Sequence, residues 1–210
     1  MPEKRRRGRP REYDADKALA SAEDTFWKRG YAGTSLDDLA TATGMNRPSL
    51  YAAFGDKRSL YLKTLEQYRD HVRATSKELL AGDPSLRAYL KRFYDAALDI
   101  YFAGSGPARG CYSIATAATE AAVDPAVRIF LADSIRNTDT FLANLIRRAR
   151  DRKEIAANSD PDALARIATA TLHTLAVRSR AGHSRRELSD LAAAVIDTIC
   201  GRAKSQSRSK

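Results

Sequence analysis

The sequence has little of what stabilises a small secreted protein or crosses a membrane. Only two cysteines occur among its 210 residues, and the wide separation of Cys111 and Cys200 matches neither a disulfide framework nor a metal-ligand spacing. No apolar run approaches the roughly 18 residues of a membrane helix, and no apolar stretch follows the basic start as it would in a secretory signal peptide. We therefore expect reduced thiols in a cytoplasmic protein without a membrane partner.

Strand and enzyme signatures are also missing. The chain shows no alternating apolar-polar run and no Asn-Gly hairpin, while its 43% hydrophobic content is enough for a core. We find no phosphate loop, cofactor fingerprint or Ser/His/Asp set, and His173 has no Cys, Asp or Glu at metal-ligand spacing. The sequence predicts an all-α protein that is not an enzyme and has neither cofactor nor metal.

The net charge of +10 is concentrated at the two ends. Residues 1–11 hold six Lys or Arg and one Glu, residues 201–210 hold four Lys or Arg and no acid, and the rest is nearly neutral. Basic end segments usually bind a polyanion such as nucleic acid or an anionic membrane surface. The alternative is a solubilising tail, which we favour for residues 202–210.

The basic arm, residues 1–11, contains Arg-Gly-Arg-Pro, which resembles the core of an AT-hook. Glycine lets such a segment lie flat and proline keeps it extended, so Arg7 and Arg9 would enter a narrow minor groove. One alternative for the whole chain is therefore an architectural DNA-binding protein that prefers A·T-rich sites and has no effector.

Cap residues divide the remaining chain into helices, about nine in all. Asp-Pro pairs precede three apolar stripes at helical spacing, and Ser184 with Glu187 forms a capping box. We expect a module of short helices over residues 12–72, a boundary near Gly82, and a region of longer helices over residues 83–201. The expected N-caps are Thr34 or Ser35, Asn46, Asp56, Asp83, Asp124, Asp160 and Ser184.

Residues 34–54 follow the helix-turn-helix plan, with two short helices joined by a turn at Gly44. Glycine takes the positive φ of such a turn at low cost. The outer side of the second helix would carry Asn46, Arg47 and Ser49, whose side chains suit base edges in the major groove. An ordinary helical hairpin has similar spacing, so the flanking sequence is needed to distinguish it from a helix-turn-helix.

That flanking sequence resembles the TetR family of transcriptional regulators. The run TSLDDLATATGMNRPSLYAAFGDKRSLY carries the resemblance, and AEDTFWKRGYAGTS fits the family's first helix. The resemblance spans residues 12–72, whereas beyond Gly82 only helical content and length match. It implies a homodimeric regulator of the bacterial cytosol and nucleoid, most often a repressor. Such a dimer reads a palindromic double-stranded DNA operator and leaves it when a small molecule binds.

The resemblance also implies DNA contacts residue by residue. Arg47 and Ser49 would contact bases, and the helix start at Thr34 and Ser35 would hold a phosphate. Ser49 and Ala53 depart from the commonest family pattern, which leaves the operator sequence open. With the arm included, the predicted contacts are Arg7, Arg9, Thr34, Ser35, Asn46, Arg47, Ser49, Tyr51 and Lys57.

The longer helices are expected to supply the dimer interface and the effector pocket. Family resemblance places the interface in the last two helices, within residues 161–200, whose small apolar residues allow close approach, although both stripes could serve the chain's own core. Aromatic residues among the longer helices could line a cavity or form plain core. The candidate lining residues are Phe93, Tyr94, Tyr101, Phe102, Cys111, Phe141 and His173.

Cys111 is the sharpest of these candidates. It follows a glycine-containing loop and opens a helix, and a helix N-terminus with Arg109 nearby would lower the pKa of the thiol and raise its reactivity. Some members of the TetR family sense electrophiles or oxidants through a cysteine at this place. The effector is therefore expected to be a small molecule or a thiol-reactive compound. The alternative is that Cys111, like Cys200, only packs.

Overall fold

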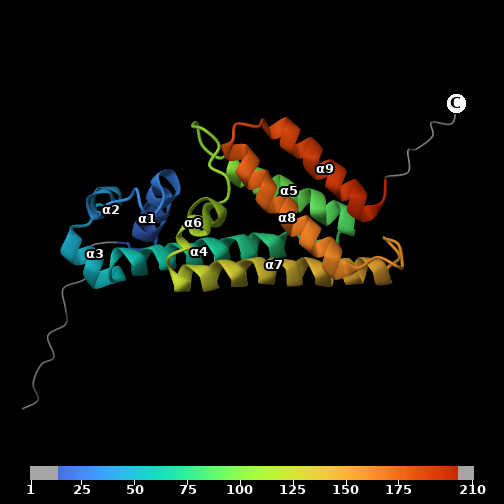
Figure 1. Ribbon diagram of the computed structural model, residues 1–210, viewed down its shortest axis with the longest axis horizontal. Helices are drawn as coiled ribbons and strands as arrows, with labels where there is room; N and C mark the ends of the chain where they lie inside the picture. Colours follow the sequence, from blue (N-terminus) through green and yellow to red (C-terminus); the bar gives the residue numbers. More distant parts are fainter. Residues whose placement is uncertain (1–13, 203–210) are drawn as a thin grey trace, which may run out of the picture. The chain divides into compact units, whose positions relative to one another are not determined.

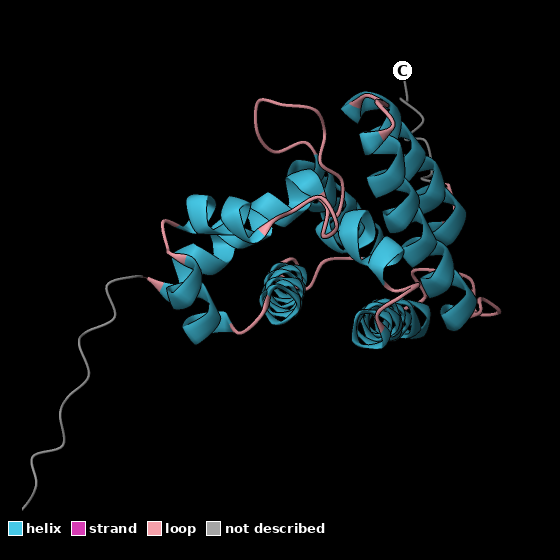
Figure 2. Cartoon of the chain, turned by 60° about the vertical axis from the view of Figure 1, so that its left-hand side comes forward, coloured by secondary structure: helices cyan, strands magenta, loops and turns pink. Residues whose placement is uncertain are grey.

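The computed structural model describes residues 14–202 and confirms an all-α fold over that range (Figure 1). The basic arm with Arg7 and Arg9, and most of the C-terminal tail, lie outside the described residues. The helices are α1 (Ala15–Arg29), α2 (Leu36–Thr43), α3 (Arg47–Phe54), α4 (Lys57–Glu78), α5 (Leu86–Tyr101), α6 (Ala118–Glu120), α7 (Pro125–Asp151), α8 (Pro161–Arg180) and α9 (Arg185–Cys200), with a π-helical turn η1 (Ser113–Ala117). Loops connect them, and no strand occurs among residues 14–202 (Figure 2).

The chain forms two compact units that meet within α4, one ending at Leu65 and the other beginning at Glu66. The sequence predicts a division at residue 72 and a boundary near Gly82. Gly82 lies in the turn between α4 and α5, with φ 80°. No cap or glycine marks the change of unit, because the backbone of α4 is continuous there.

Local capping explains the helices of the first unit. Ser35 is the N-cap of α2, one of the two predicted candidates, and it forms a capping box: it accepts a hydrogen bond from the Asp38 N–H, and the Asp38 side chain accepts one from the Ser35 N–H. Gly44 takes the left-handed conformation, φ 67° and ψ 16°, and ends α2. Asn46 caps α3 through the Ser49 N–H at 2.8 Å. These caps produce the predicted helix-turn-helix.

A small aromatic and aliphatic core holds the first unit together. Phe26 of α1 and Leu39 of α2 are fully buried, and Leu50 of α3 is 2% exposed. The ring of Tyr61 at the start of α4 packs edge-on against Phe26, with centroids 5.1 Å apart. Burying such side chains contributes about 1.5–3 kcal/mol each, and it leaves the opposite side of α3 in solvent.

Capping also fixes the helices of the larger unit, with one correction. Asp124 and Asp160 cap α7 and α8, and Ser184 with Glu187 forms the capping box of α9, as predicted. Asp83 does not cap α5. Its φ is 46° and its carboxylate pairs with Arg152, while Ser85 accepts the capping bond from the Ala88 N–H. Asp83 lies two residues before the N-cap Ser85, which places its carboxylate too far from the N–H groups of the first turn.

The core of the larger unit lies among α5, α7, α8 and α9. Leu90, Leu98, Leu142, Ile146 and Leu175 are all fully buried within it. These side chains occupy the apolar stripes seen in the sequence, so the stripes serve the chain's own core. In the part of the chain that the structure describes, no helix combines the length and the apolar character needed to cross a membrane.

The loop between α5 and η1 approaches α8 closely at Gly110. A Cβ atom on Gly110, whose φ is 64°, would lie 2.6 Å from the Ala176 carbonyl oxygen and 3.0 Å from Cγ of Arg180. The Arg180 guanidinium also donates to the Arg109 carbonyl at 3.3 Å. Only glycine fits this approach, which sets the position of the next residue, Cys111.

Candidate functional site

The exposed side of α3 carries the arginine that the sequence predicts to contact bases. Arg47 makes a two-point ion pair with Asp37 of α2, Nε to Oδ1 at 2.7 Å and Nη2 to Oδ2 at 2.5 Å. This pair lowers the pKa of Asp37, chiefly through the hydrogen bond from Arg47. The Arg47 side chain is 54% exposed, so the pair holds the guanidinium at the surface.

Three further predicted contact residues of this unit have side chains that are exposed, partly exposed or in contact with an aromatic ring. Tyr51, one turn after Arg47 on α3, is 47% exposed. The Lys57 ammonium, at the first residue of α4, lies 4.3 Å from the centre of the Tyr31 ring, a cation–π distance. Ser49 is partly exposed and its N–H is held by Asn46.

Thr34 requires a correction. Its side chain is 2% exposed, and its hydroxyl donates to the Gly30 carbonyl at 2.7 Å. A buried hydroxyl that is already donating cannot hold a phosphate as well. Ser35, the exposed N-cap of α2, remains at the helix start where the free N–H groups point outward.

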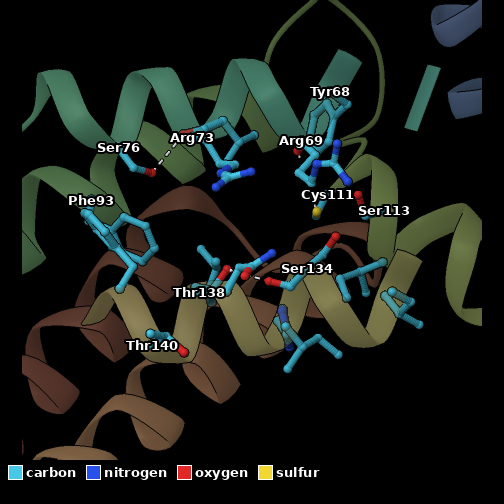
Figure 3. A pocket seen from close by; sticks show the side chains of 18 of the residues that line it. Tyr68, Arg69, Arg73, Ser76, Phe93, Cys111, Ser113, Ser134, Thr138 and Thr140 are labelled. Atoms are coloured by element: carbon cyan, nitrogen blue, oxygen red, sulfur yellow. Dashed lines mark hydrogen bonds between the residues drawn. The ribbon is translucent and has the colours of Figure 1, made fainter. Parts of the chain in front are cut away.

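The larger unit contains a cavity of about 370 Å³ between α4 and α7, lined also by residues of α5, α8 and the segment around η1 (Figure 3). This volume lies within the range of sites for small organic ligands. Every lining residue lies between Tyr68 and His173 and belongs to the larger unit.

Four of the expected lining residues do face this pocket: Phe93, Cys111, Phe141 and His173. Tyr94 and Tyr101 do not. Both are buried in the core, where the Tyr94 hydroxyl donates to the Ala168 carbonyl at 3.0 Å and the Tyr101 hydroxyl to the Leu172 carbonyl at 3.4 Å. Phe102, at the end of α5, packs against the core and does not line the pocket.

The sequence reasoning missed the pocket residues on α4 and most of those on α7. Arg69, Arg73 and Lys77 of α4 line the cavity, and so do Ser134 and Thr138 of α7. The signal that could have found the α4 residues is their spacing. Basic residues at intervals of four lie on one face of a helix.

Cys111 lies on the pocket wall directly before the helical residues that lead into η1 (Figure 3). Its sulfur accepts a hydrogen bond from the Tyr68 hydroxyl at 3.6 Å. Burial raises the pKa of the Cys111 thiol, against the lowering effect of the Ile114 N–H and the Tyr68 hydroxyl. The expected fall in pKa is therefore wrong for this conformation, because desolvation outweighs the helix start.

His173 shares the pocket wall without belonging to a metal site. Burial lowers the pKa of its imidazole, while the nearby Asp139 carboxylate opposes that shift. The imidazole is therefore neutral at neutral pH. Within residues 14–202, the structure shows no group of three or more His, Cys, Asp or Glu that could hold a metal ion.

The fold thus combines a helix-turn-helix unit with a helical unit that encloses a ligand-sized cavity, and known proteins share both parts. Residues 18–64 match the model of bacterial regulatory proteins of the tetR family, and residues 84–195 match the model of the tetracyclin repressor-like C-terminal domain. The chain belongs to the TetR family of transcriptional regulators, and it is a DNA-binding regulator, not an enzyme.

Individual relatives agree over most of the chain. The transcriptional repressor ComR of Escherichia coli (strain K12) is 29% identical over 194 residues, 92% of each chain. The uncharacterized regulator YezE of Bacillus subtilis (strain 168) is 32% identical over 161 residues, 76% of this chain and 82% of YezE. A cysteine mutant of the TetR family regulator CifR, solved with a 26-base-pair double-stranded operator DNA, has a TM-score of 0.81 and 31% identity. The match covers 90% of this chain and 98% of the CifR chain.

The environment of Cys111 predicts slow alkylation with a displaced pH profile. In a Cys200→Ser background, the pH profile of Cys111 modification by iodoacetamide should have its midpoint at a higher pH in the folded chain than in urea, because burial raises the pKa of this thiol. In urea the midpoint should lie at about pH 8.5, the ordinary thiol pKa. Mass spectrometry of the Cys111 peptide measures both profiles. A native profile that levels off below the urea profile would contradict the burial effect.

Proposed function

We propose that this regulator is a homodimeric repressor that binds a palindromic operator in double-stranded DNA and leaves it when an effector occupies the pocket of the larger unit. One observation carries the proposal. The helix α4 begins with Lys57 in the helix-turn-helix unit and continues through Arg69, Arg73 and Lys77, which line the pocket. A ligand bound by those residues acts on an element that the DNA-binding unit shares.

Exposed apolar residues on α8 support the homodimer. Ile167 is 44% exposed and Val177 is 56% exposed, although other positions of α8 belong to the core. Ala170, three residues after Ile167, is exposed as well. Residues 167, 170 and 177 lie on one helix face, and the small alanine allows another helix to approach. The exposed Ala193 and Ala194 offer α9 for the same contact. A second copy of the chain would cover this face.

The exposed side of α3 supports operator recognition. In the major groove, Arg47 would exchange Asp37 for a guanine edge, to which arginine donates two hydrogen bonds. Ser49 would contact a neighbouring base, and Tyr51 and Lys57 would hold phosphates on either side. Among the relatives, CifR has been solved with its operator DNA, which supports the same class of partner here.

The basic arm would supply charge that the helix-turn-helix lacks. Residues 12–58 hold eight acids and six bases, whereas residues 1–11 have a net charge of +5. A DNA-binding protein whose helix-turn-helix is slightly acidic needs positive charge from another segment to bind phosphates. We place Arg7 and Arg9 in the minor groove beside each half-site, where they favour A·T-rich flanks.

The effector would include compounds that react with thiols. Cys111 lines the pocket of the larger unit, so an electrophile bound there would meet the sulfur directly. Addition to a maleimide double bond forms an S–C bond, and the thiol proton ends on the adjacent carbon. The added group then occupies the cavity permanently and holds the regulator in its released form.

Replacing Arg47 tests operator recognition. Arg47→Ala should weaken operator binding by about 1–3 kcal/mol, the value of a two-point arginine contact to a base. Arg29→Ala is the matched control, because Arg29 of α1 also pairs with an aspartate of α2, Asp38, at 2.7 Å. Fluorescence anisotropy with an operator found by oligonucleotide selection measures both. Equal affinities of the two variants would contradict base reading by Arg47.

Removing the arm tests its electrostatic role. Deletion of residues 1–10 should weaken operator binding and flatten the plot of log affinity against log salt by about 0.9 per lost phosphate contact. Removal of residues 203–210, which hold three basic residues, is the control and should leave the slope close to that of the full chain. An unchanged slope after the deletion would indicate that the arm makes no phosphate contacts and is only a solubilising tail. Binding by the arm alone, with the same A·T preference, would favour the architectural alternative.

Replacing Cys111 tests the thiol response. Cys111→Ser should bind the operator like the unmodified chain but remain bound after treatment with N-ethylmaleimide, whereas Cys200→Ser should still be released. Burial also raises the pKa of Cys200, to about 11, so the control cysteine is not intrinsically more reactive. Operator release is followed by anisotropy, with mass spectrometry to confirm the adduct. Release of the Cys111→Ser variant by the reagent would exclude Cys111 as the sensor.

A further inference from the structure

The charged residues that line the pocket have one sign. Arg69, Arg73 and Lys77 follow one another at intervals of four along α4, and no Asp or Glu lines the cavity. This spacing places the three cations on a single face of the helix. The wall formed by α4 is therefore a basic strip along one side of a cavity of about 370 Å³.

Arg73 and Lys77 are the members of the strip whose side-chain charges are not paired within the described chain. Arg69 donates to the Asp70 carboxylate at 3.2 Å and lies 5.3 Å from the centre of the Phe130 ring. No hydrogen bond or ion pair joins the Arg73 side chain to another of residues 14–202. Figure 3 shows its side chain extending from α4 into the space that faces Ser134 and Thr138 of α7.

The rest of the cavity is largely apolar. Phe93 of α5, Phe141, Leu131 and Ile135 of α7, and Leu172 of α8 all line it. These side chains suit a ring or a short hydrocarbon body, whose transfer from water is favourable. The pocket therefore has a basic side on α4, and opposite it apolar side chains of α5, α7 and α8 together with hydroxyls such as those of Ser134 and Thr138.

Neutral and cationic ligands fit this arrangement poorly. A neutral ligand would cover the Arg73 guanidinium and remove water from it without returning a partner. A cationic ligand would face three like charges, and neither Asp70, which pairs with Arg69, nor Asp139, which acts on His173, lines the cavity. An anionic group on Arg73 gains a charge-assisted hydrogen bond, stronger than a neutral one.

We propose that the effector is a small organic anion whose carboxylate or similar oxyanion binds Arg73, and whose apolar body lies among Phe93, Phe141 and Leu172. The assignment rests on the proposed function of the pocket as the effector site. Arg69 and Lys77 raise the local positive potential on either side of Arg73 and draw the anion to the α4 wall.

A pair of fluorescent probes separates the charge from the apolar body. Anilinonaphthalene sulfonate is an organic anion, and N-phenylnaphthylamine has the same ring system without the sulfonate. The full-length chain should bind the sulfonate more tightly than the neutral amine. Arg73→Met should weaken sulfonate binding by about tenfold or more, the worth of a hydrogen bond to a charged group, and leave amine binding nearly unchanged. Arg73→Lys should retain part of the preference.

Arg136→Met is the matched control, because Arg136 lies on α7 with a 70% exposed side chain and does not line the pocket. It loses the same charge and should keep the preference for the sulfonate. Equal binding of the two probes by the full-length chain, or equal loss in the Arg73 and Arg136 variants, would overturn the anion assignment.

Operator binding by the same proteins separates the two levels of inference. Arg73→Met should bind selected operator DNA like the unmodified chain, and the sulfonate should weaken that binding for the full-length chain more than for the variant. If operator binding is specific but the probes are not distinguished, the regulator stands and the ligand class is wrong. If no operator is bound, the proposed function itself fails, whatever the probes show.

Discussion

The continuous hydrogen bonding of α4 over Lys57–Glu78 is the constraint on which both units depend. Residues 57–78 contain no proline, so nothing in the sequence interrupts the hydrogen bonds of this helix. Its first turns bury Leu60, Tyr61 and Leu65 in the core of the DNA-binding unit, and its later turns supply the basic wall of the pocket. Any ligand that holds those later turns acts on the helix that completes the smaller core.

The ion pair between Arg47 and Asp37 gives the arginine side chain a defined position and still leaves it at the surface, where DNA could reach it. Exposed ion pairs contribute little to stability, and both side chains here are more than half exposed. The proposed move of Arg47 from Asp37 to a base edge would therefore cost little, while the pair keeps the guanidinium on the outer side of α3. The same carboxylate would disfavour a phosphate placed close to it, which would restrict how α2 could meet a DNA backbone.

Much of the fold could be predicted because helix caps are local. Ser35 with Asp38, Asn46, Asp124 and Asp160 each satisfy N–H groups two or three residues away, so the sequence alone contains both partners. Asp83 shows the limit, since Ser85 lies nearer to the start of α5 and takes the cap.

The pocket was harder to predict because its residues are defined by distant partners. The hydroxyls of Tyr94 and Tyr101 donate to carbonyls of α8 more than 70 residues away, which turns expected lining residues into core. The pKa of Cys111 depends on burial and on Tyr68, 43 residues earlier. The spacing of Arg69, Arg73 and Lys77 places them on one face of α4, but only the position of α7 reveals that this face borders a cavity.

The raised pKa of Cys111 and the basic wall together indicate how the pocket would select among reactive compounds. A thiol whose pKa is raised has little thiolate at neutral pH, so free electrophiles in solution react with it slowly. A compound held beside the sulfur gains from proximity, which compensates for a low thiolate fraction. Selectivity would then come from binding, through an anionic group on α4 and an apolar body on α7, and not from an intrinsically reactive cysteine. The absence of a low-pKa thiol is thus compatible with thiol sensing, provided that the ligand is recognised first.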